Sequence, residues 1–196
     1  LTKDKLKFIN DIGITERDSV VKYAEIVKKE LNYEVPVVGV GSTPTCSKPP
    51  EHLDGVTEMH PGNFMYFDVM QSRIGACELS DIACAVVVTV TSHYPDQNKI
   101  MMDAGWTAIT VQGAGCGYGA IEGCPDLRIK CLKQEAGEIE SSDGSPIVFS
   151  KYPIGSQLRV LPYHSCAHTK CHDVAYLLET RTSELVSETW TICRGW

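Results

Sequence analysis

The chain has 196 residues, of which 43% are hydrophobic and 22% are charged, a composition typical of a globular protein that buries a core. Its formal net charge of -7 argues against a nucleic-acid partner, because binding to phosphate backbones needs a basic surface. The longest apolar run, Ile82 to Val90, is shorter than the ~18 residues of a membrane helix, so no membrane partner is expected.

The chain contains nine cysteines at irregular spacing. An odd number without a regular pattern favours reduced thiols over a disulfide framework, and reduced thiols indicate a cytoplasmic protein. No signal peptide is visible, but the sequence begins at Leu1 rather than at a methionine, so a targeting segment upstream stays an open question.

The first predicted element is an amphipathic helix over residues Thr15 to Leu31. Thr15 followed three residues later by Asp18 is typical of a capped helix start. Apolar residues then recur at helical spacing, namely Val20, Ala24, Val27 and Leu31.

Two short strands are predicted next. Residues Val35 to Val40 form a continuous apolar run, as parallel strands do when both faces are covered, and residues 56–59 form a second short run. A turn follows each strand, at residues 41–45 and 60–63. This order of helix, strand, loop, strand and loop predicts the closing βα units of a barrel or of an open α/β sheet.

The pattern changes from about Ser80 to short apolar or alternating runs, separated by clusters of Gly, Pro, Asp and Ser. Such runs predict an antiparallel β domain. They cover residues 82–90, 99–102, 127–132, 158–161, 174–178 and 187–193. We place the boundary near residues 70–80, which gives an α/β domain over residues 1–75 and a β domain over residues 76–196.

Metal-binding residue types are densest between Tyr163 and Asp173. Within an extended segment His164 and Cys166 would share one face, since side chains two residues apart point the same way. Imidazole and thiolate suit zinc, and two protein ligands would leave the open positions of a catalytic site. The alternatives are a solvated histidine and a cysteine that packs as a small hydrophobe. The other candidates in this cluster are His168, Cys171, His172 and Asp173.

The two turns that follow the predicted strands are candidates for a phosphate site. Gly41, Ser42 and Thr43 offer backbone N–H groups and small hydroxyls, and Gly62 allows a ligand to approach the N–H groups of Gly62 and Asn63. Each motif alone is better explained as an ordinary turn. Two successive strand ends of this kind favour phosphate binding, because the last two βα loops of α/β barrels commonly build such a site.

A glycine-rich run extends from Gly113 to Gly119. It does not match the dinucleotide-binding fingerprint, because Tyr118 stands where the last glycine of that motif belongs. We expect a mobile loop.

Several motifs, in order from about residue 35 to the last residue, together resemble the eukaryotic D-serine dehydratase family. None of them is specific alone, but their number and order make the resemblance strong. They are Gly41-Ser-Thr-Pro-Thr-Cys46, His52-Leu-Asp-Gly-Val-Thr-Glu-Met-His-Pro-Gly-Asn63, Phe67-Asp-Val-Met-Gln71, Asp103-Ala-Gly-Trp-Thr-Ala108, Tyr152-Pro-Ile-Gly-Ser156, Leu161-Pro-Tyr-His-Ser-Cys-Ala167 and Cys193-Arg-Gly-Trp196.

The resemblance implies an α/β plus β fold: the last βα units of an alanine-racemase-like TIM barrel that binds pyridoxal phosphate, followed by a C-terminal antiparallel β domain. It implies that Thr43 and the backbone of Gly62 and Asn63 hold the cofactor phosphate, and that His164 and Cys166 bind Zn²⁺ close to that phosphate pocket. Because two subunits of this family pair around the active site, a homodimer is implied for the complete enzyme.

The reaction implied by the resemblance is α,β-elimination of water from the small-molecule substrate D-serine, which gives pyruvate and ammonia. Pyridoxal phosphate would accept the charge left when the α-proton departs, and zinc would assist the departing hydroxide as a Lewis acid. Since the metal ligands must be deprotonated, acid is expected to remove zinc before it unfolds the chain.

The sequence also departs from the family pattern. The Schiff-base lysine lies near the family's N-terminus and no residue here matches its motif, so we expect no catalytic residue in this chain and no activity of the chain alone. The family's Gln-Glu-His-Gly stretch has Ala136 in place of histidine, and the segment after Cys166 is unusually rich in His and Cys. A barrel cannot close with two strands, so the chain is either a C-terminal fragment or one of two chains.

Two alternatives stay open. A D-threonine aldolase-like enzyme would share the cofactor and fold, but its metal motif resembles His-x-Asp where Cys166 stands here, and a preference for manganese would favour it. A non-catalytic homologue that binds pyridoxal phosphate or zinc for regulation is the other alternative, and the missing lysine and Ala136 motivate it.

Overall fold

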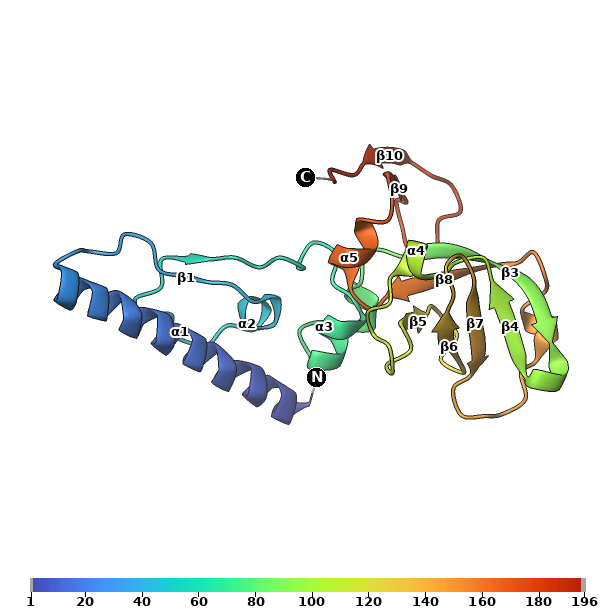
Figure 1. The fold of residues 1–196 in the computed structure, drawn as a ribbon, viewed down its shortest axis with the longest axis horizontal. Helices are drawn as coiled ribbons and strands as arrows, with labels where there is room; N and C mark the ends of the chain where they lie inside the picture. The colour runs from blue at the N-terminus through green and yellow to red at the C-terminus, as the bar shows by residue number, and fades with distance from the viewer. Residues whose placement is uncertain (1, 195–196) are drawn as a thin grey trace. The chain divides into compact units, whose positions relative to one another are not determined.

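The computed structural model describes residues 2–194, and its helices and strands are drawn in Figure 1. The chain divides into two compact units, Leu1–Ala83 and Cys84–Trp196. The division therefore follows Ala83, whereas the sequence suggested a boundary near residues 70–80. Each unit is described separately below.

A long helix, α1 (Lys3–Leu31), opens the first unit. The side chain of Thr2 caps it by accepting a hydrogen bond from the Lys5 amide at 3.4 Å, and Asn32 ends it in a left-handed conformation. The predicted end at Leu31 is confirmed, but the predicted start at Thr15 is wrong. Thr15 lies inside the helix, where its hydroxyl donates to the Asp11 carbonyl at 2.9 Å, a bond that hydroxyl side chains make in helix interiors.

Two short parallel strands follow, β1 (Gly39–Val40) and β2 (Glu58–Met59), paired Gly39 with Glu58 and Val40 with Met59. The first strand is much shorter than the predicted run from Val35, and Pro36 within that run cannot donate a ladder hydrogen bond. The turn after β1 continues as helix α2 (Thr43–Ser47), and the helices α3 (Val69–Ile74) and η1 (Leu79–Asp81) complete the unit. This is an α/β arrangement, and its membership of a TIM barrel stays a prediction.

The second unit is built on a six-stranded sheet with the order β5-β8-β3-β4-β7-β6. Every pair of neighbours is antiparallel, so the predicted antiparallel β domain is confirmed. The edge strands β5 and β6 lie close to each other, which makes the sheet nearly closed. The strands are β3 (Val86–Tyr94), β4 (Lys99–Met102), β5 (Gly119–Ile121), β6 (Leu127–Leu132), β7 (Gly137–Ser141) and β8 (Gln157–Pro162).

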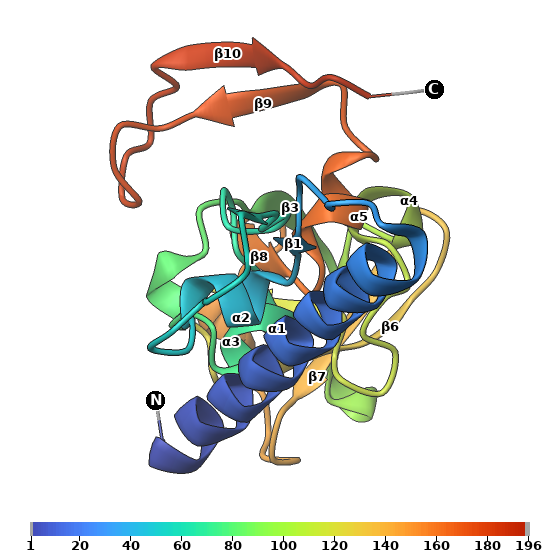
Figure 2. The same ribbon diagram turned by 90° about the vertical axis from the view of Figure 1, so that its left-hand side faces the viewer.

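Short helices and a hairpin complete the second unit. The helices are α4 (Trp106–Ile109), α5 (Ser165–Thr169), η2 (Pro95–Gln97) and η3 (Phe149–Lys151). The strands β9 (Val174–Leu177) and β10 (Glu188–Thr191) pair only with each other, antiparallel. Figure 2 shows them as a separate hairpin.

Alternation along the strands places one face of the sheet in the core. On β3, Val86, Val88 and Val90 are buried, whereas Val87 between them is exposed. The same core contains Ile100, Met102, Ile109, Ile121, Leu127, Ile129, Ile139, Ile147, Tyr152 and Val160.

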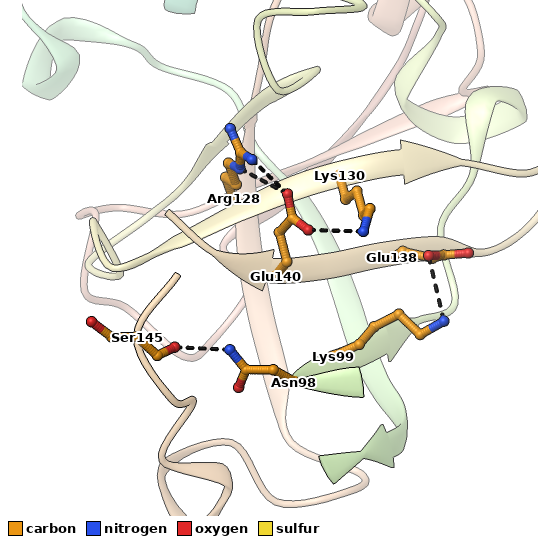
Figure 3. A network of polar contacts seen from close by, with 7 residues as sticks. All are labelled: Asn98, Lys99, Arg128, Lys130, Glu138, Glu140 and Ser145. Carbon is orange, nitrogen blue, oxygen red and sulfur yellow. Dashed lines mark hydrogen bonds and ion pairs between the residues drawn. The ribbon is translucent and has the colours of Figure 1, made fainter. Parts of the chain in front are cut away.

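The opposite face carries charged pairs between neighbouring strands (Figure 3). The carboxylate of Glu140 on β7 lies 2.7 Å from Arg128 and 3.1 Å from Lys130 on β6. Lys99 on β4 lies 3.5 Å from Glu138 on β7. Opposite charges on facing positions support the pairing of the strands.

Candidate functional site

The two turns expected to bind phosphate meet in the first unit. Because β1 and β2 are parallel, their carboxyl ends lie at the same edge, and the turns that follow carry Thr43 and Asn63. The backbone N–H of Asn63 donates to the Thr43 hydroxyl at 2.9 Å, and both residues are buried. The structure thus brings together two of the three residues predicted to hold the cofactor phosphate.

A carboxylate from α1 fixes the first turn. Glu16 accepts hydrogen bonds from the Gly41 amide at 3.1 Å and from the Thr45 hydroxyl at 2.7 Å. Nothing in the sequence marked Glu16 for this role, because it lies 25 residues from Gly41 on what reads as the polar face of a helix. The helix therefore sets the conformation of the turn that presents Thr43.

The side-chain amide and the backbone carbonyl of Asn63 also make hydrogen bonds. Its side-chain amide donates to Asp68, whose exposure is 0%, and its carbonyl accepts from the Phe67 amide at 2.8 Å. Asp68 in turn caps α3 by accepting from the Gln71 amide at 2.8 Å. Phe67, with φ of 53°, adopts a left-handed conformation that is rare for a bulky residue. The turn is therefore strongly constrained.

Gly62 differs from its neighbour. The Asn63 amide, expected to contact phosphate, instead donates to Thr43. Gly62 is exposed, and a Cβ placed on it would meet nothing within 4 Å. Within residues 2–194 its N–H has no hydrogen-bond partner. The turn thus presents one free backbone donor to open space, and the roles of Thr43, Gly62 and Asn63 toward a phosphate stay predictions.

The predicted metal ligands lie at the start of α5. His164 is the N-cap, with extended backbone angles, and Cys166 is the second residue of the helix. The expectation that both residues lie in one extended segment is wrong, because β8 ends at Pro162 and the chain turns into the helix. His164 is half-buried and Cys166 is exposed. Neither side chain has a hydrogen-bond or ion-pair partner in the described part of the chain.

Across residues 2–194, no three His, Cys, Asp or Glu side chains are placed to hold one metal ion. A cation at His164 and Cys166 would therefore take its remaining ligands from outside this set, such as water or substrate. This is the open coordination that distinguishes catalytic zinc from structural zinc.

The two neighbouring histidines turn away from this role. The His168 ring, 6% exposed, donates through Nδ1 to the Ala108 carbonyl at 3.2 Å, and His172 reaches the same carbonyl through Nε2 at 3.0 Å. Burial lowers the pKa of His168 to about 4, so this ring is neutral near pH 7. The sequence analysis counted these residues among the candidate metal ligands. Their hydrogen bonds to Ala108 could not be predicted, because Ala108 lies 60 and 64 residues away in the sequence.

The glycine-rich run packs beside the same segment. At Gly113, with φ of 85°, a Cβ would lie 2.5 Å from the ring of Tyr163, the residue before His164. Only glycine fits there. Whether the loop is mobile stays a prediction.

The nine cysteines are all free thiols. Over residues 2–194, none of the helices has the length and apolar character needed to cross a membrane.

Comparison with known proteins gives a family match in the second unit. A model of the putative serine dehydratase domain matches residues 83–178, a range that includes His164 and Cys166. The chain is 39% identical to the D-serine dehydratase of Dictyostelium discoideum over 171 residues, which cover 81% of this chain and 43% of that protein.

A second relative is the D-threo-3-hydroxyaspartate dehydratase of Delftia sp., 34% identical over 92% of this chain and 50% of that protein. A solved structure of a His-to-Ala mutant of D-threo-3-hydroxyaspartate dehydratase matches with a TM-score of 0.88 at 30% identity, covering 97% of this chain and 51% of that one. An alanine-racemase-like protein from Idiomarina loihiensis matches with a TM-score of 0.83 at 30% identity, over 97% and 52%. The chain thus spans about half the length of the relatives it matches.

Proposed function

Because the chain belongs to the D-serine dehydratase family, we propose that it supplies the phosphate-binding and zinc-binding residues of an enzyme that eliminates water from D-serine. The observation that carries the proposal is the pair His164 and Cys166, which stand at the start of a helix with side chains free of other partners in the described residues. The reaction breaks the Cα–H and Cβ–O bonds of the substrate, and the product hydrolyses to pyruvate and ammonia.

The turns of the first unit fit a phosphate group. Gly62 offers an unpaired N–H beside open space, and backbone donors in such a turn bind anions. The Thr43 hydroxyl accepts from Asn63 and keeps its own proton to donate to a phosphate oxygen. Bound pyridoxal phosphate would supply a ring that accepts the negative charge left at Cα.

The start of α5 fits a zinc ion. Thiolate and imidazole ligands favour zinc over metals that prefer carboxylate ligands, such as manganese. Zinc at an open site would polarise the substrate hydroxyl. Two solved structures of D-threo-3-hydroxyaspartate dehydratase support this assignment: they carry His-to-Ala and Cys-to-Ala substitutions two positions apart, and the second is a metal-free form. That spacing equals the spacing of His164 and Cys166.

We propose the following roles for the chain's own residues. Thr43 and Gly62 bind and orient the phosphate, and Asn63 fixes Thr43. His164 and Cys166 would hold the metal, which would supply Lewis-acid assistance to departure of the hydroxyl. The family resemblance implies a Schiff-base lysine whose motif no residue of this chain matches, so the chain alone is proposed to be inactive, and the complete enzyme is proposed to be a cytoplasmic homodimer.

A second substrate is D-threo-3-hydroxyaspartate. The similarity to the Delftia dehydratase covers nearly the whole chain, and this substrate also carries a hydroxyl on Cβ of a D-amino acid. The chemistry at the metal is then unchanged, and only the group beyond Cβ differs.

The test is elimination by this chain joined to the N-terminal half of the Dictyostelium relative, supplied with pyridoxal phosphate and zinc. We expect pyruvate from D-serine, none from L-serine, and loss of product with Cys166→Ala. Oxaloacetate from D-threo-3-hydroxyaspartate would identify the second substrate. Retro-aldol cleavage of D-threonine with manganese, or cofactor binding without turnover, would contradict the proposal in favour of an aldolase or a non-catalytic homologue.

A further inference from the structure

The helix that carries Cys166 cannot hold its own position. α5 has 5 residues, and isolated helices shorter than about 12–15 residues are not stable in water. At its ends, the His168 amide donates to the His164 carbonyl at 3.2 Å, and the Thr169 hydroxyl donates to the Ser165 carbonyl at 2.7 Å. The orientation of Cys166 therefore depends on contacts between α5 and other elements.

Two imidazoles provide such contacts at a single backbone oxygen. His168 Nδ1 lies 3.2 Å and His172 Nε2 lies 3.0 Å from the Ala108 carbonyl, and the two rings meet edge-to-face with centroids 4.9 Å apart. A carbonyl only accepts, so each ring donates. Ala108 lies in the last turn of α4, where carbonyls lack intrahelical donors, and the two rings use both of its lone pairs.

The sheet in turn fixes α4. The Trp106 amide donates to the Lys133 carbonyl at 2.9 Å. The Thr107 amide and hydroxyl both donate to the Gln134 carbonyl, at 3.2 Å and 2.7 Å. At Gly105 a Cβ would lie only 2.2 Å from the Lys133 carbonyl oxygen, so the two segments are in close contact. A continuous series of bonds thus connects the turn between β6 and β7 to α4 and then to α5.

Backbone strain marks the end of α4 as a constrained site. Thr110 has φ of 72° and ψ of 166°, a region that β-branched residues almost never occupy. Its buried hydroxyl has no partner among the described residues. Such a conformation persists only where the surroundings enforce it, and it occurs mostly at functional sites.

We propose that Ala108, His168 and His172 form a clamp that orients His164 and Cys166 for metal binding. The histidines are assigned as positioning residues and not as ligands, because no three His, Cys, Asp or Glu side chains of residues 2–194 are placed to hold one metal ion. The inference rests on the proposed zinc-binding role of His164 and Cys166 and extends it to the contacts that hold them, since groups outside the ligand set orient ligands and set metal affinity.

The test compares variants that keep or remove the donor. His172→Gln keeps a side-chain N–H at the Nε2 position and His168→Asn keeps one at the Nδ1 position, whereas His172→Leu and His168→Leu remove it. The matched control is His93→Leu, because His93 Nε2 makes the same kind of bond to the Tyr152 carbonyl, at 2.7 Å, in the same unit. Zinc affinity is measured by competition with a chromophoric chelator, and Co²⁺ in place of zinc reports the ligand geometry through its thiolate charge-transfer band.

We expect each Leu variant at 168 or 172 to weaken zinc binding by about 10–100-fold and to change the cobalt spectrum. His172→Gln and His168→Asn should bind like the original chain, and His93→Leu should lower thermal stability without changing zinc affinity. If one Leu variant fails to fold, the test is decided at the other position, by comparing its Leu variant with the variant that keeps the donor. Wild-type zinc affinity in folded Leu variants overturns the clamp. Zinc binding by the unaltered chain is measured first, and its absence overturns the proposed function instead of the clamp.

Discussion

The two units of the chain are stabilised in different ways. In the second unit, six strands enclose a continuous core in which side chains such as Val88 and Ile139 are fully buried. In the first unit, α1 buries only Ile9 and Gly13 along 29 residues, and the unit has two strands of two residues each. Large apolar side chains on α1 stay exposed, namely Leu6, Phe8, Ile12, Ile14, Tyr23, Ile26 and Leu31.

This difference affects how each candidate site is held. In the first unit, carboxylates fix the two turns proposed to bind phosphate: Glu16 binds the turn at Gly41, and Asp68 binds Asn63. In the second unit, α5 is tied through α4 to a sheet with a packed core. We therefore expect the candidate phosphate turns to depend on single carboxylates, and the candidate metal site to depend both on the hydrogen bonds that hold α5 and on the packed core below α4.

The largest expected effect is on core packing. Ile139→Ala removes a side chain with 0% exposure and should lower the free energy of unfolding of the second unit by about 2–5 kcal/mol. Ile26→Ala, at 42% exposure on α1, should cost less than about 1 kcal/mol. Urea denaturation measures both. Equal losses for the two variants would remove the contrast between the units.

Acid should destabilise the second unit through His168. Its folded-state pKa of about 4 lies below the ordinary value of 6.5 because the ring is buried, so the unfolded chain takes up a proton first. Stability is therefore lost as the pH falls from 6.5 toward 4, by at most about 3 kcal/mol. Denaturation of metal-free protein across this range should show a shallower pH dependence for His168→Asn than for the original chain. An unchanged dependence would contradict the burial of this ring.

A smaller effect is expected in the first unit. Thr43→Val removes the acceptor of the buried backbone N–H of Asn63 and should lower the free energy of unfolding by about 1–3 kcal/mol. It should also reduce the affinity for pyridoxal phosphate. Thr43→Ser keeps the acceptor and should retain both properties. Thermal denaturation and a cofactor titration measure these effects, with pyridoxal lacking the phosphate as the control ligand. If Thr43→Val binds the cofactor normally, Thr43 has no role at the phosphate.

The smallest effect is a difference in thiol reactivity. Burial raises the pKa of the Cys77 thiol in the first unit to about 11, so it is protonated near pH 8, and the thiolate is the reactive form. Cys166 in the second unit is exposed. Timed alkylation followed by peptide mass spectrometry should label Cys166, with the other exposed thiols Cys116 and Cys193, before Cys77, and zinc should protect Cys166 alone.

Much of the β domain could be predicted from the sequence, since alternation directly indicates which face of a strand is buried. Residues 99–102 and 127–132 were predicted as the strands they form. Two strands were missed for physical reasons. β7 contains a single large apolar residue, Ile139, between two glutamates, and β5 begins in the glycine run and has three residues. In each case partner strands, and not local preference, determine the structure.

The candidate sites were predicted in part. Thr43 and Asn63 meet because parallel strands end at one edge, which strand order alone could predict. The contacts of Glu16, Asp68 and Ala108 could not be predicted, because they join residues through tertiary packing or use a backbone carbonyl that any residue carries. The turn from β8 into α5 was also missed, since the short run from His164 to Thr169 has no helical periodicity to detect.

X-ray absorption at the zinc edge tests the central claim most directly, namely that His164 and Cys166 bind one zinc ion. The purified chain loaded with one equivalent of zinc should show one sulfur neighbour at about 2.3 Å and at least one nitrogen at about 2.0–2.1 Å, and the sulfur should disappear in Cys166→Ala. A first shell of oxygen and nitrogen alone, or a sulfur signal that persists in Cys166→Ala, would contradict the account.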